Sequence, residues 1–406
     1  MSRNTAQWLA KPKLPPTHYA DPAIYSDPAL FAEEKEKIFK KVWWLACHES
    51  ELPNPGDYRT YHHPGDAELV IVRGDDLKVR TFFNICPHRG NLLVYTPSGS
   101  VKNFVCIFHQ WAFNVRGDCV DIPREKPGYQ DRVCKTDLAL KEVRTEVGFG
   151  GFVWVNLDDN AATLKSEIGP ALDYMLPELE AEPLQTFWYY QARLKTNFKL
   201  IHDTNSEFYH DYLHVYNRIT GMLKPDSGYF QRRYTPFPNG HASVGSMVVN
   251  YDAYKSTGRS ELGWPNLPPK GWKLVDLFPC ITVNLRTSVL RIDTYIPLGP
   301  DDVILEFRAL GLKSDTPEIR RQREKDAAVI WSPFGRNLHE ALLASSGQGI
   351  AMAKGSQPMY VLQAREEDAT IHDEVGMRHY LAEWSRRMGR SSADPYATER
   401  VGARAA

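Results

Sequence analysis

The sequence has few cysteines, no long apolar run and no excess of charge of either sign. Six cysteines in 406 residues are too few for a disulfide scaffold, so clustered cysteines are first considered as metal ligands or reactive groups. No apolar stretch reaches the roughly 18 residues that a membrane-spanning helix needs. The N-terminus, MSRNTAQWLAKPKLPP, lacks the apolar segment of a secretory signal. We therefore expect a soluble, cytoplasmic protein with reduced thiols.

The charges are almost balanced, with 49 Lys and Arg against 50 Asp and Glu, which argues against a nucleic-acid-binding surface as the main feature of the chain. Hydrophobic residues make up 42% of the sequence, as in ordinary globular proteins. At roughly 150 residues per domain, this length predicts two or three domains. The composition therefore favours a globular enzyme or binding protein over a disordered chain.

The texture of the sequence changes along the chain, and these changes predict four regions. Short apolar runs alternate with Gly, Pro, Asn and Asp between residues 42 and 157, which is typical of a compact all-β module. Beyond this module strands and helices mix, and residues 278–311 indicate strands of an antiparallel sheet. The overall prediction is an α+β protein. Its expected regions are an N-terminal arm and helix (1–41), the all-β domain (42–157), an α+β catalytic domain (158–390) and a flexible tail (391–406).

The all-β region carries two Cys/His pairs. Cys86-Pro-His88 and Cys106-Ile-Phe-His109 each follow an apolar run, and seventeen residues separate His88 from Cys106. One interpretation is that these are two ordinary buried cysteines and two surface histidines without a metal. That interpretation is disfavoured, because Cys and His paired at short spacing usually indicate a metal site. A structural zinc site and a Rieske [2Fe–2S] cluster both use two cysteines and two histidines. Zinc fingers normally pair Cys with Cys, whereas each pair here contains one of each.

A second cluster of ligand-type residues lies between residues 197 and 216. Residues 199–215 are predicted to form a helix, on which His210 and His214 share a face one turn apart. Glu207 lies on the same stripe, and Asp203 lies one turn earlier. A helix with two partly buried, hydrogen-bonded histidines remains an alternative, since the H-x₃-H spacing alone is a weak signal. Two histidines on one face are also what a mononuclear iron site needs.

Together these motifs resemble the Rieske non-haem iron oxygenases of the ring-hydroxylating type. The match rests on C-P-H-R-G, on C-x₂-H-x-W and on a segment similar to the family's N-W-K-x₃-E-N-x₂-D-x-Y-H-x₃₋₄-H. Asn197-Phe198-Lys199 corresponds to N-W-K, and Tyr209-His210 to Y-H. The resemblance implies a helix-grip catalytic domain and a [2Fe–2S] cluster held by Cys86, His88, Cys106 and His109. It also implies that His210 and His214 bind a mononuclear Fe(II).

The sequence departs from this family at two acidic positions. The family's E-N is Asp203-Thr204 here, and the acid three residues before the first histidine is Glu207 in place of Asp. The resemblance implies that Glu207 links His210 to His109 of a neighbouring subunit and so joins the two redox centres. The length and coupling of this link are expected to change with the longer side chain.

The family takes its third iron ligand from a late helix, roughly two turns before a glutamine. Glu340 lies eight residues before Gln348, and no aspartate occurs in that window. Glu340 is therefore the predicted third ligand, since such iron sites combine two histidines with one carboxylate. The alternatives are an ordinary surface role for Glu340, and His339 or Asp211 as the ligand.

Polar residues near the predicted iron site and in the predicted sheet are candidates for substrate contacts. An arginine among them would hold a substrate carboxylate through a two-point ion pair. For each single residue, a position at the sheet edge or in a subunit contact is the more common role than a substrate contact, because a pocket has few polar groups. The main candidates are Asn217, Arg218, Asn284 and Arg286, and Arg291 is a further one.

The resemblance predicts the terminal oxygenase (α) component of a multicomponent Rieske oxygenase. It implies a homotrimer, with or without β subunits, and a separate NAD(P)H-dependent reductase, with or without a ferredoxin. An aromatic carboxylic acid of the benzoate, salicylate or anthranilate type is the expected substrate. A quaternary amine or a demethylation is the alternative within the family. A Rieske electron carrier without catalytic iron and a structural zinc protein are the alternatives outside it.

Overall fold

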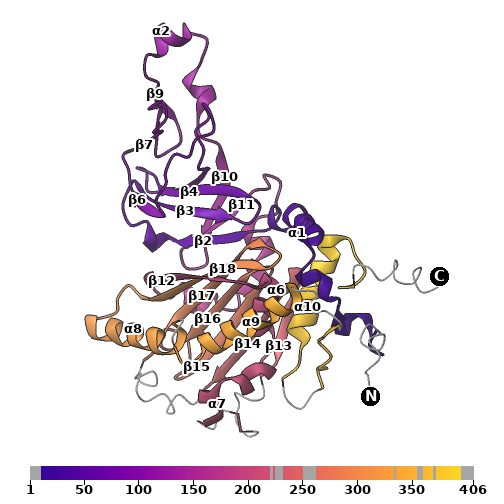
Figure 1. Cartoon of the computed structure of the whole chain (residues 1–406). Helices are drawn as coiled ribbons and strands as arrows, with labels where there is room; N and C mark the ends of the chain where they lie inside the picture. Colours follow the sequence, from indigo (N-terminus) through magenta and orange to yellow (C-terminus); the bar gives the residue numbers. More distant parts are fainter. Residues whose placement is uncertain are drawn as a thin grey trace, which may run out of the picture. The chain divides into compact units, whose positions relative to one another are not determined.

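The computed structural model describes residues 11–219, 223–224, 232–249, 262–332, 335–353, 360–368 and 372–394 (Figure 1). The chain divides into two compact units. One comprises residues 39–164, and the other comprises residues 165–406 together with the N-terminal segment 1–38. The N-terminal helix therefore belongs to the larger unit, whereas the sequence predicted a separate arm.

The smaller unit is built from two antiparallel sheets. The first sheet has seven strands in the order β2-β11-β10-β5-β4-β3-β6, and the second has three in the order β7-β8-β9. The strands are β2 (Trp44–His48), β3 (Asp57–His63), β4 (Ala67–Arg73), β5 (Val79–Phe83), β6 (Ser98–Ser100), β7 (Asn103–Val105), β8 (Ala112–Asn114), β9 (Cys119–Asp121), β10 (Glu142–Gly148) and β11 (Phe152–Asn156). One short helix, α2 (Glu125–Tyr129), accompanies them.

The core of the smaller unit lies directly beneath the two Cys/His loops. Val70, Val72 and Phe82 pack in one apolar cluster with the buried Cys86 and Cys106. Because the thiols belong to this cluster, the loops that carry them are fixed to the sheet by apolar burial.

The larger unit contains one seven-stranded antiparallel sheet, in the order β12-β18-β17-β16-β15-β14-β13. The strands are β12 (Leu184–Leu194), β13 (Tyr234–Phe237), β14 (His241–Val248), β15 (Gly271–Leu277), β16 (Ile281–Arg286), β17 (Leu290–Gly299) and β18 (Asp302–Leu312). Every residue of β16 is buried, as are the first eight of β17. These central strands are therefore covered on both faces, and polar side chains in them need partners within the fold.

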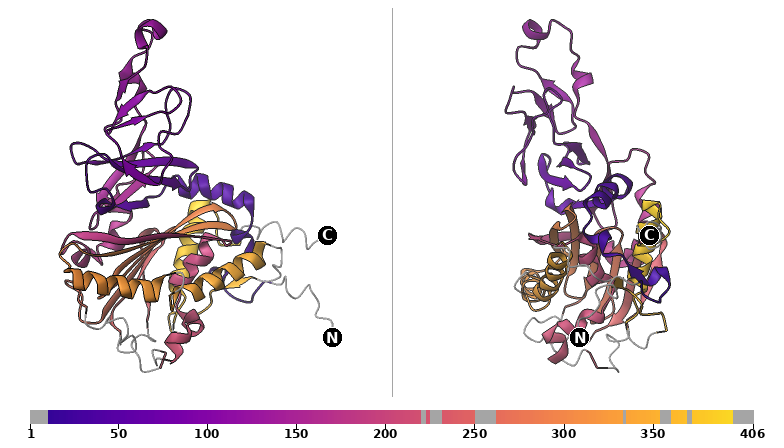
Figure 2. Two further views of the ribbon diagram at one scale, coloured as in Figure 1. Left: turned by 60° about the vertical axis from the view of Figure 1, so that its left-hand side comes forward. Right: turned by 45° about the vertical axis from the view of Figure 1, so that its right-hand side comes forward.

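Helices cover the sheet and its edge. They are α1 (Pro28–Glu34), α3 (Leu164–Glu167), α4 (Gly169–Leu172), α5 (Leu176–Leu179), α6 (Phe198–Ser206), α7 (Val215–Ile219), α8 (Pro317–Trp331), α9 (Leu338–Ala353) and α10 (Val375–Met388). Helices α8 and α9, orange in Figure 1, run along the sheet, and the two views of Figure 2 show the same arrangement. Thr316 caps α8 by accepting from the N–H of Ile319, and Asn197 caps α6 through Lys199. The mixed architecture confirms the predicted α+β class.

The N-terminal arm is fixed to the larger unit by a buried ion pair. Lys199 Nζ lies 2.6 Å from Glu34 Oε1, and both side chains are at most 1% exposed. Trp384 Nε1 donates to the same oxygen at 2.6 Å. A buried pair with additional hydrogen bonds is strongly destabilised when one partner is removed. Helix α1 is thereby joined to α6 and α10.

The end of the chain is partly packed. Asp21 N–H donates to the carbonyl of Ala393 at 2.8 Å, and Asp394 is buried. Ala393 and Asp394 therefore differ from the predicted flexible tail, because both are buried and have partners elsewhere in the fold. The rest of that tail, 395–406, lies outside the described residues. Among the described helices, none is both long and apolar enough to cross a membrane.

Candidate metal centres and active site

The two Cys/His loops of the smaller unit have the same backbone design. In each loop the residue four positions after the cysteine donates its N–H to the cysteine carbonyl, Gly90 to Cys86 and Gln110 to Cys106, both at 2.9 Å. Both donors adopt positive φ, 74° for Gly90 and 62° for Gln110. A left-handed residue closes such a turn. The two turns therefore hold their Cys and His side chains on the same backbone conformation.

The four predicted cluster ligands converge at the tips of these loops. The rings of His88 and His109 lie 4.5 Å apart, centroid to centroid. Cys86 and Cys106 are buried, and the pKa of the Cys86 thiol is raised by burial and by the neighbouring Cys106 thiol. The Nδ1 atom of His88 is buried and has no hydrogen-bond partner among the described residues. Two adjacent thiols and an unpartnered imidazole nitrogen fit a [2Fe–2S] cluster of the Rieske type.

Two aromatic residues orient His88. Trp111 stacks on its ring at a centroid distance of 4.5 Å and an interplanar angle of 5°. The hydroxyl of Tyr129 lies 3.3 Å from His88 Nε2. With Nε2 in contact with the hydroxyl, Nδ1 is the nitrogen left for a metal, as expected for a ligand held by a hydrogen bond on its other nitrogen.

The predicted continuous helix over residues 199–215 was wrong. Helix α6 ends at Ser206, Glu207 is extended (φ −147°, ψ 158°), and residues Tyr209–Leu213 form a 3-10 helix. The break has a physical cause, because Phe208 turns into the core of the sheet. Its ring packs against Tyr234 and Trp272, each at a centroid distance of 5.6 Å.

The structure nevertheless brings His210 and His214 together. Their rings lie 5.4 Å apart, and the tight turn is held by i→i+3 hydrogen bonds, including His214 N–H to the carbonyl of Asp211 at 3.1 Å. A 3-10 turn followed by the start of α7 therefore achieves the proximity that the sequence attributed to an α-helical face.

Glu207 contacts His210 through both carboxylate oxygens. Oε1 lies 2.8 Å from Nδ1 of His210, and Oε2 accepts the backbone N–H of His210 at 3.1 Å. Burial acts to raise the pKa of Glu207, but the charge and the hydrogen bonds of His210 outweigh it and lower the pKa. An ionised Glu207 holds the proton of His210 on Nδ1, which leaves Nε2 as the ligand atom.

Two further carboxylates lie beside the histidines. Glu340, in the first turn of α9, places Oε2 2.8 Å from Nδ1 of His214, and its Oε1 accepts from the N–H of Val215 at 3.3 Å. Asp211 offers an oxygen that lies within 4.8 Å of ligand nitrogens of His210 and His214. The third candidate, His339, directs Nδ1 to the carbonyl of Gly335.

Asp211 is already engaged by a cation. The guanidinium of Arg232 forms a buried ion pair with its carboxylate. Arg232 also lies over the ring of Phe208, 3.8 Å from the centroid. Asp211 is therefore engaged by a cation, whereas Glu340 contacts the imidazole of His214 and a backbone N–H.

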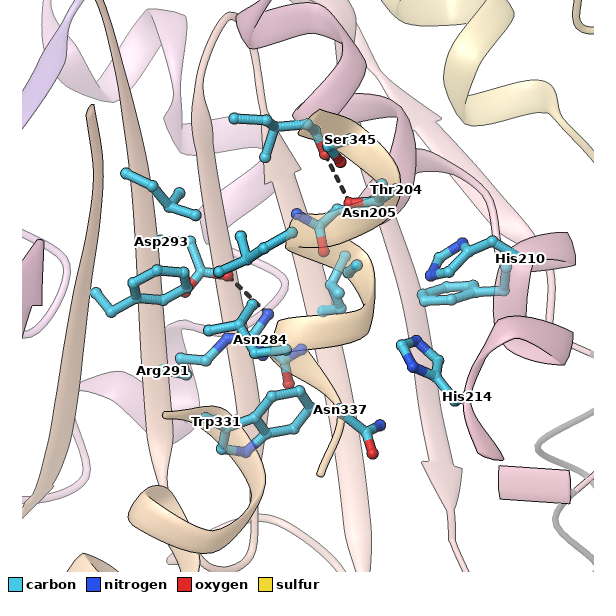
Figure 3. Close-up of a pocket in the computed structure, with 18 of the residues that line it drawn as sticks. Thr204, Asn205, His210, His214, Asn284, Arg291, Asp293, Trp331, Asn337 and Ser345 are labelled. Carbon is cyan, nitrogen blue, oxygen red and sulfur yellow. Dashed lines mark hydrogen bonds and ion pairs between the residues drawn. The ribbon is translucent and has the colours of Figure 1, made fainter. Parts of the chain in front are cut away.

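The two histidines border a pocket between the sheet and α9 (Figure 3). Its empty space, including the solvent at its mouth, is about 690 Å³. The residues lining it are Ile201, Thr204, Asn205, Phe208, His210, Asp211, His214, Trp272, Leu274, Asn284, Arg286, Arg291, Asp293, Tyr295, Leu305, Phe307, Trp331, Asn337, Leu338, Ala341, Leu342 and Ser345.

The predicted substrate contacts divide into two groups. Asn284 and Arg286 line the pocket, as does Arg291. Asn217 and Arg218 do not belong to the lining: Asn217 is fully buried with its amide 3.4 Å from Asp211 Oδ1, and Arg218 is exposed. Both residues belong to α7, a separate helix that begins after His214.

Sequence reasoning missed several lining residues, notably Asp293, Trp331 and Asn337. A signal for Asp293 was present in the sequence. Arg291 and Asp293 are two residues apart on β17, so both face the same side of the strand.

Family comparison decides the class of this protein. Residues 42–144 match the model of the Rieske [2Fe-2S] domain, and residues 181–390 match the ring hydroxylating alpha subunit (catalytic domain). The chain belongs to the ring-hydroxylating Rieske oxygenases. It is therefore an oxygenase α subunit with a Rieske [2Fe–2S] cluster and a mononuclear iron, and NAD(P)H reaches such oxygenases through a separate reductase.

Two curated relatives of this Rieske oxygenase cover nearly the whole chain. The methanesulfonate monooxygenase hydroxylase subunit alpha of Methylosulfonomonas methylovora is 47% identical over 97% of both chains. The 2-aminobenzenesulfonate 2,3-dioxygenase subunit alpha of Alcaligenes sp. is 40% identical over 97% of this chain and 99% of the relative.

Solved structures of other Rieske oxygenases share the fold. Naphthalene 1,2-dioxygenase from Rhodococcus sp. superposes with a TM-score of 0.77 at 20% identity, over 90% of this chain and 93% of that one. A quaternary ammonium Rieske monooxygenase in complex with L-carnitine superposes with a TM-score of 0.72 at 19% identity, over 93% and 100%. Membership in this enzyme family disfavours the electron-carrier and structural-zinc alternatives, because the chain carries both domains.

Proposed function

We propose that this Rieske oxygenase inserts oxygen from O₂ into a small organic acid at an iron held by His210, His214 and Glu340. The observation that carries the proposal is the convergence of His210 and His214 at the wall of one pocket, with a carboxylate beside each ring. Glu207 and Glu340 each lie 2.8 Å from an imidazole Nδ1. Two histidines and one carboxylate are the ligand set of non-haem Fe(II) oxygenases.

The residues around this site have separate tasks. Bound iron supplies the redox chemistry that combines O₂ with the substrate. Glu207 fixes the tautomer of His210, so that its Nε2 lone pair is available. Trp272 and Phe208 form an apolar wall that limits water near the histidines. The substrate would occupy the remaining space beside the two imidazoles.

Electrons would reach this iron from a Rieske cluster held by Cys86, His88, Cys106 and His109. We propose a homotrimer, with or without β subunits, in which the cluster of one subunit supplies the iron of the next. In that arrangement Glu207 would connect His210 to His109 of the neighbouring subunit. The partners that reduce the cluster would be a reductase, with or without a ferredoxin.

The names of the relatives support a substrate class that the sequence motifs do not specify. The two relatives above are named for methanesulfonate and 2-aminobenzenesulfonate, both organic sulfonates. The expected benzoate-type acid therefore shares its negative charge with the relatives' substrates but differs in its acidic group. A quaternary amine is the second candidate, supported by the carnitine complex of a structural neighbour.

A single turnover tests this proposal. The purified chain is reduced chemically, freed of reductant and exposed to O₂ with a mixture of sulfonates, aromatic acids and quaternary amines. Products are identified by mass spectrometry with ¹⁸O₂. A hydroxylated acid containing ¹⁸O is the expected result, and a demethylated or cleaved amine would favour the second candidate. Absence of any product with about three irons per chain present would contradict the proposal.

A further inference from the structure

Arg291 is a buried cation in the pocket whose hydrogen-bonding capacity is only partly used. Its side chain is 7% exposed, and Nη2 pairs with Asp293 Oδ2 at 2.7 Å. Nε and Nη1 are also buried, and no described residue accepts a hydrogen bond from them. Buried donors without acceptors are rare in folded proteins because each one is unfavourable. Arg291 therefore has the character of a ligand-binding group.

Arg286 reinforces the positive charge at the same end of the pocket. It belongs to β16, the neighbour of β17, and is 6% exposed. Its guanidinium lies 4.9 Å from the ring centroid of Trp272 and 5.1 Å from that of Trp331. Arg291 contacts Trp331 even more closely, at 4.0 Å. The two aromatic rings hold both guanidinium groups in place beside the pocket.

Asn284 supplies a neutral donor between the two arginines. It pairs directly with Arg291 across β16 and β17, and it lies two residues before Arg286 on the same face of β16. Its Oδ1 accepts from Trp272 Nε1 at 2.9 Å. Since the oxygen is occupied, the NH₂ group is the end of the amide that remains to donate into the pocket.

Asp293, the carboxyl paired with Arg291, does not cancel the positive charge of the two arginines. Burial raises the pKa of Asp293 to about 6, with Arg291 opposing that rise. Even a fully ionised Asp293 provides one negative charge against two guanidinium groups. The other lining acid, Asp211, is paired with Arg232. Among the lining residues of β16 and β17, two arginines therefore face one aspartate.

We infer that Arg291, Arg286 and Asn284 bind the head group of an organic sulfonate. The inference rests on the proposed function and specifies the substrate class of that site. A sulfonate has three equivalent oxygens in a tetrahedral array, so it accepts hydrogen bonds from three directions, whereas a carboxylate is planar and has two oxygens. Three donors from two adjacent strands match the sulfonate. Buried charge-assisted hydrogen bonds of this kind are the strong ones.

This binding mode also orients the substrate. Figure 3 shows Arg291 and Asn284 on the opposite side of the pocket from His210 and His214. A sulfonate anchored at the arginines therefore directs its carbon atoms toward the histidines. The length of the substrate then decides which of its carbon atoms lies nearest the iron site.

The test is a binding experiment that needs no turnover. Isothermal titration calorimetry of the oxidised, anaerobic holoenzyme measures Kd for two matched pairs: methanesulfonate with acetate, and benzenesulfonate with benzoate. We expect at least one sulfonate to bind about tenfold or more tightly than its carboxylate partner. Equal affinities, or tighter binding of the carboxylates, would overturn the sulfonate assignment. This comparison uses the unaltered protein, so it does not depend on the folding of a variant.

Variants then test the residues. Arg291→Gln should weaken sulfonate binding by about tenfold or more, and Arg291→Lys should restore only part of it, because lysine keeps the charge but loses the planar fork. Arg193→Gln is the matched control, since Arg193 is 64% exposed and pairs with Asp302 outside the pocket. The visible Rieske spectrum and the iron content report whether each variant is folded.

The outcomes separate this inference from the proposed function. If sulfonates bind the wild type but Arg291→Gln leaves their Kd unchanged, the head-group site lies elsewhere. If no sulfonate binds while another acid is oxygenated in the single turnover, the inference fails and the proposed function stands. If sulfonates bind as expected and no acid is oxygenated, the proposed function fails and the anion site stands.

Discussion

The carboxylate of Glu207 lies 2.8 Å from Nδ1 of His210 and accepts the backbone N–H of the same residue at 3.1 Å. In both contacts a carboxylate oxygen of Glu207 accepts a hydrogen bond, and the negative charge of the carboxylate strengthens the contact with Nδ1. Glu207→Gln keeps the size and one acceptor oxygen but removes the charge. We expect both metals to remain bound and the transfer of electrons between them to slow by about tenfold or more.

Stopped-flow measurement of Rieske cluster reoxidation, with substrate and O₂ present, checks this expectation. Glu207→Asp is the informative companion, because it restores the charge with a shorter side chain and should recover part of the rate. Loss of the cluster in Glu207→Gln would show that Glu207 has a structural role instead.

His210 and His214 were predicted as iron ligands from the resemblance to the Rieske oxygenases together with their spacing, and the structure places their rings 5.4 Å apart on one side of the pocket. His210→Ala should abolish turnover and lower the iron content by about one iron per chain. The red-brown Rieske chromophore should remain, because its ligands belong to the other compact unit. Metal analysis with the visible spectrum measures both effects. Full activity in this variant would refute the iron site.

Glu340 and Asp211 are the two carboxylates that compete for the third iron position. Since Asp211 is neutralised by Arg232, we expect Glu340→Gln to reduce the iron content by about one per chain and Asp211→Asn to retain it. Both variants are isosteric and each removes one carboxylate beside the histidines, so they serve as controls for one another. Iron and acid-labile sulfide are measured on each. Iron loss only in Asp211→Asn would assign the third position to Asp211.

The two candidate metal sites differ in how far the sequence predicted the proximity of their residues. The Cys86/His88 and Cys106/His109 pairs are local, so a short turn is enough to place the members of each pair close together. The proximity of His210 and His214 was also predicted, but on an α-helical face that the structure does not contain. Burial of Phe208 between Tyr234 and Trp272 broke that helix, and such a long-range contact leaves no periodic signal in the sequence.

The pocket itself was harder to predict. Asn284, Arg286 and Arg291 were identified as polar residues in an apolar stretch, and the strand pairing explains why they meet: Asn284 is directly opposite Arg291. Trp331, however, comes from the end of α8. Its approach to the arginines depends on how α8 packs on the sheet. The pattern of apolar residues indicates which face of a helix or strand is buried, but not which other element packs against that face.

The buried carboxyl of Asp203 should make the stability of the larger unit depend on pH. Asp203 is 8% exposed, and its Oδ1 has no hydrogen-bond partner among the described residues. Burial, together with the negative charge of Glu207, raises the pKa of Asp203 to about 8. The unfolded chain loses this proton near pH 4, at about the ordinary pKa of aspartate. The folded state thus binds more protons between these values, and its stability falls as the pH rises from about 4 to about 8.

Asp203→Asn removes this titration while preserving shape. We expect the variant to lose less stability than the wild type between about pH 6 and about pH 8, by on the order of 1 kcal/mol or more. Asp173→Asn is the control, because Asp173 is exposed and its surface ion pair with Lys165 contributes little. Chemical denaturation followed by tryptophan fluorescence at several pH values measures the slopes. Parallel slopes for wild type and Asp203→Asn would show that Asp203 is already ionised in the folded protein, and that Tyr25, whose hydroxyl lies 3.5 Å from Oδ2, stabilises the charge.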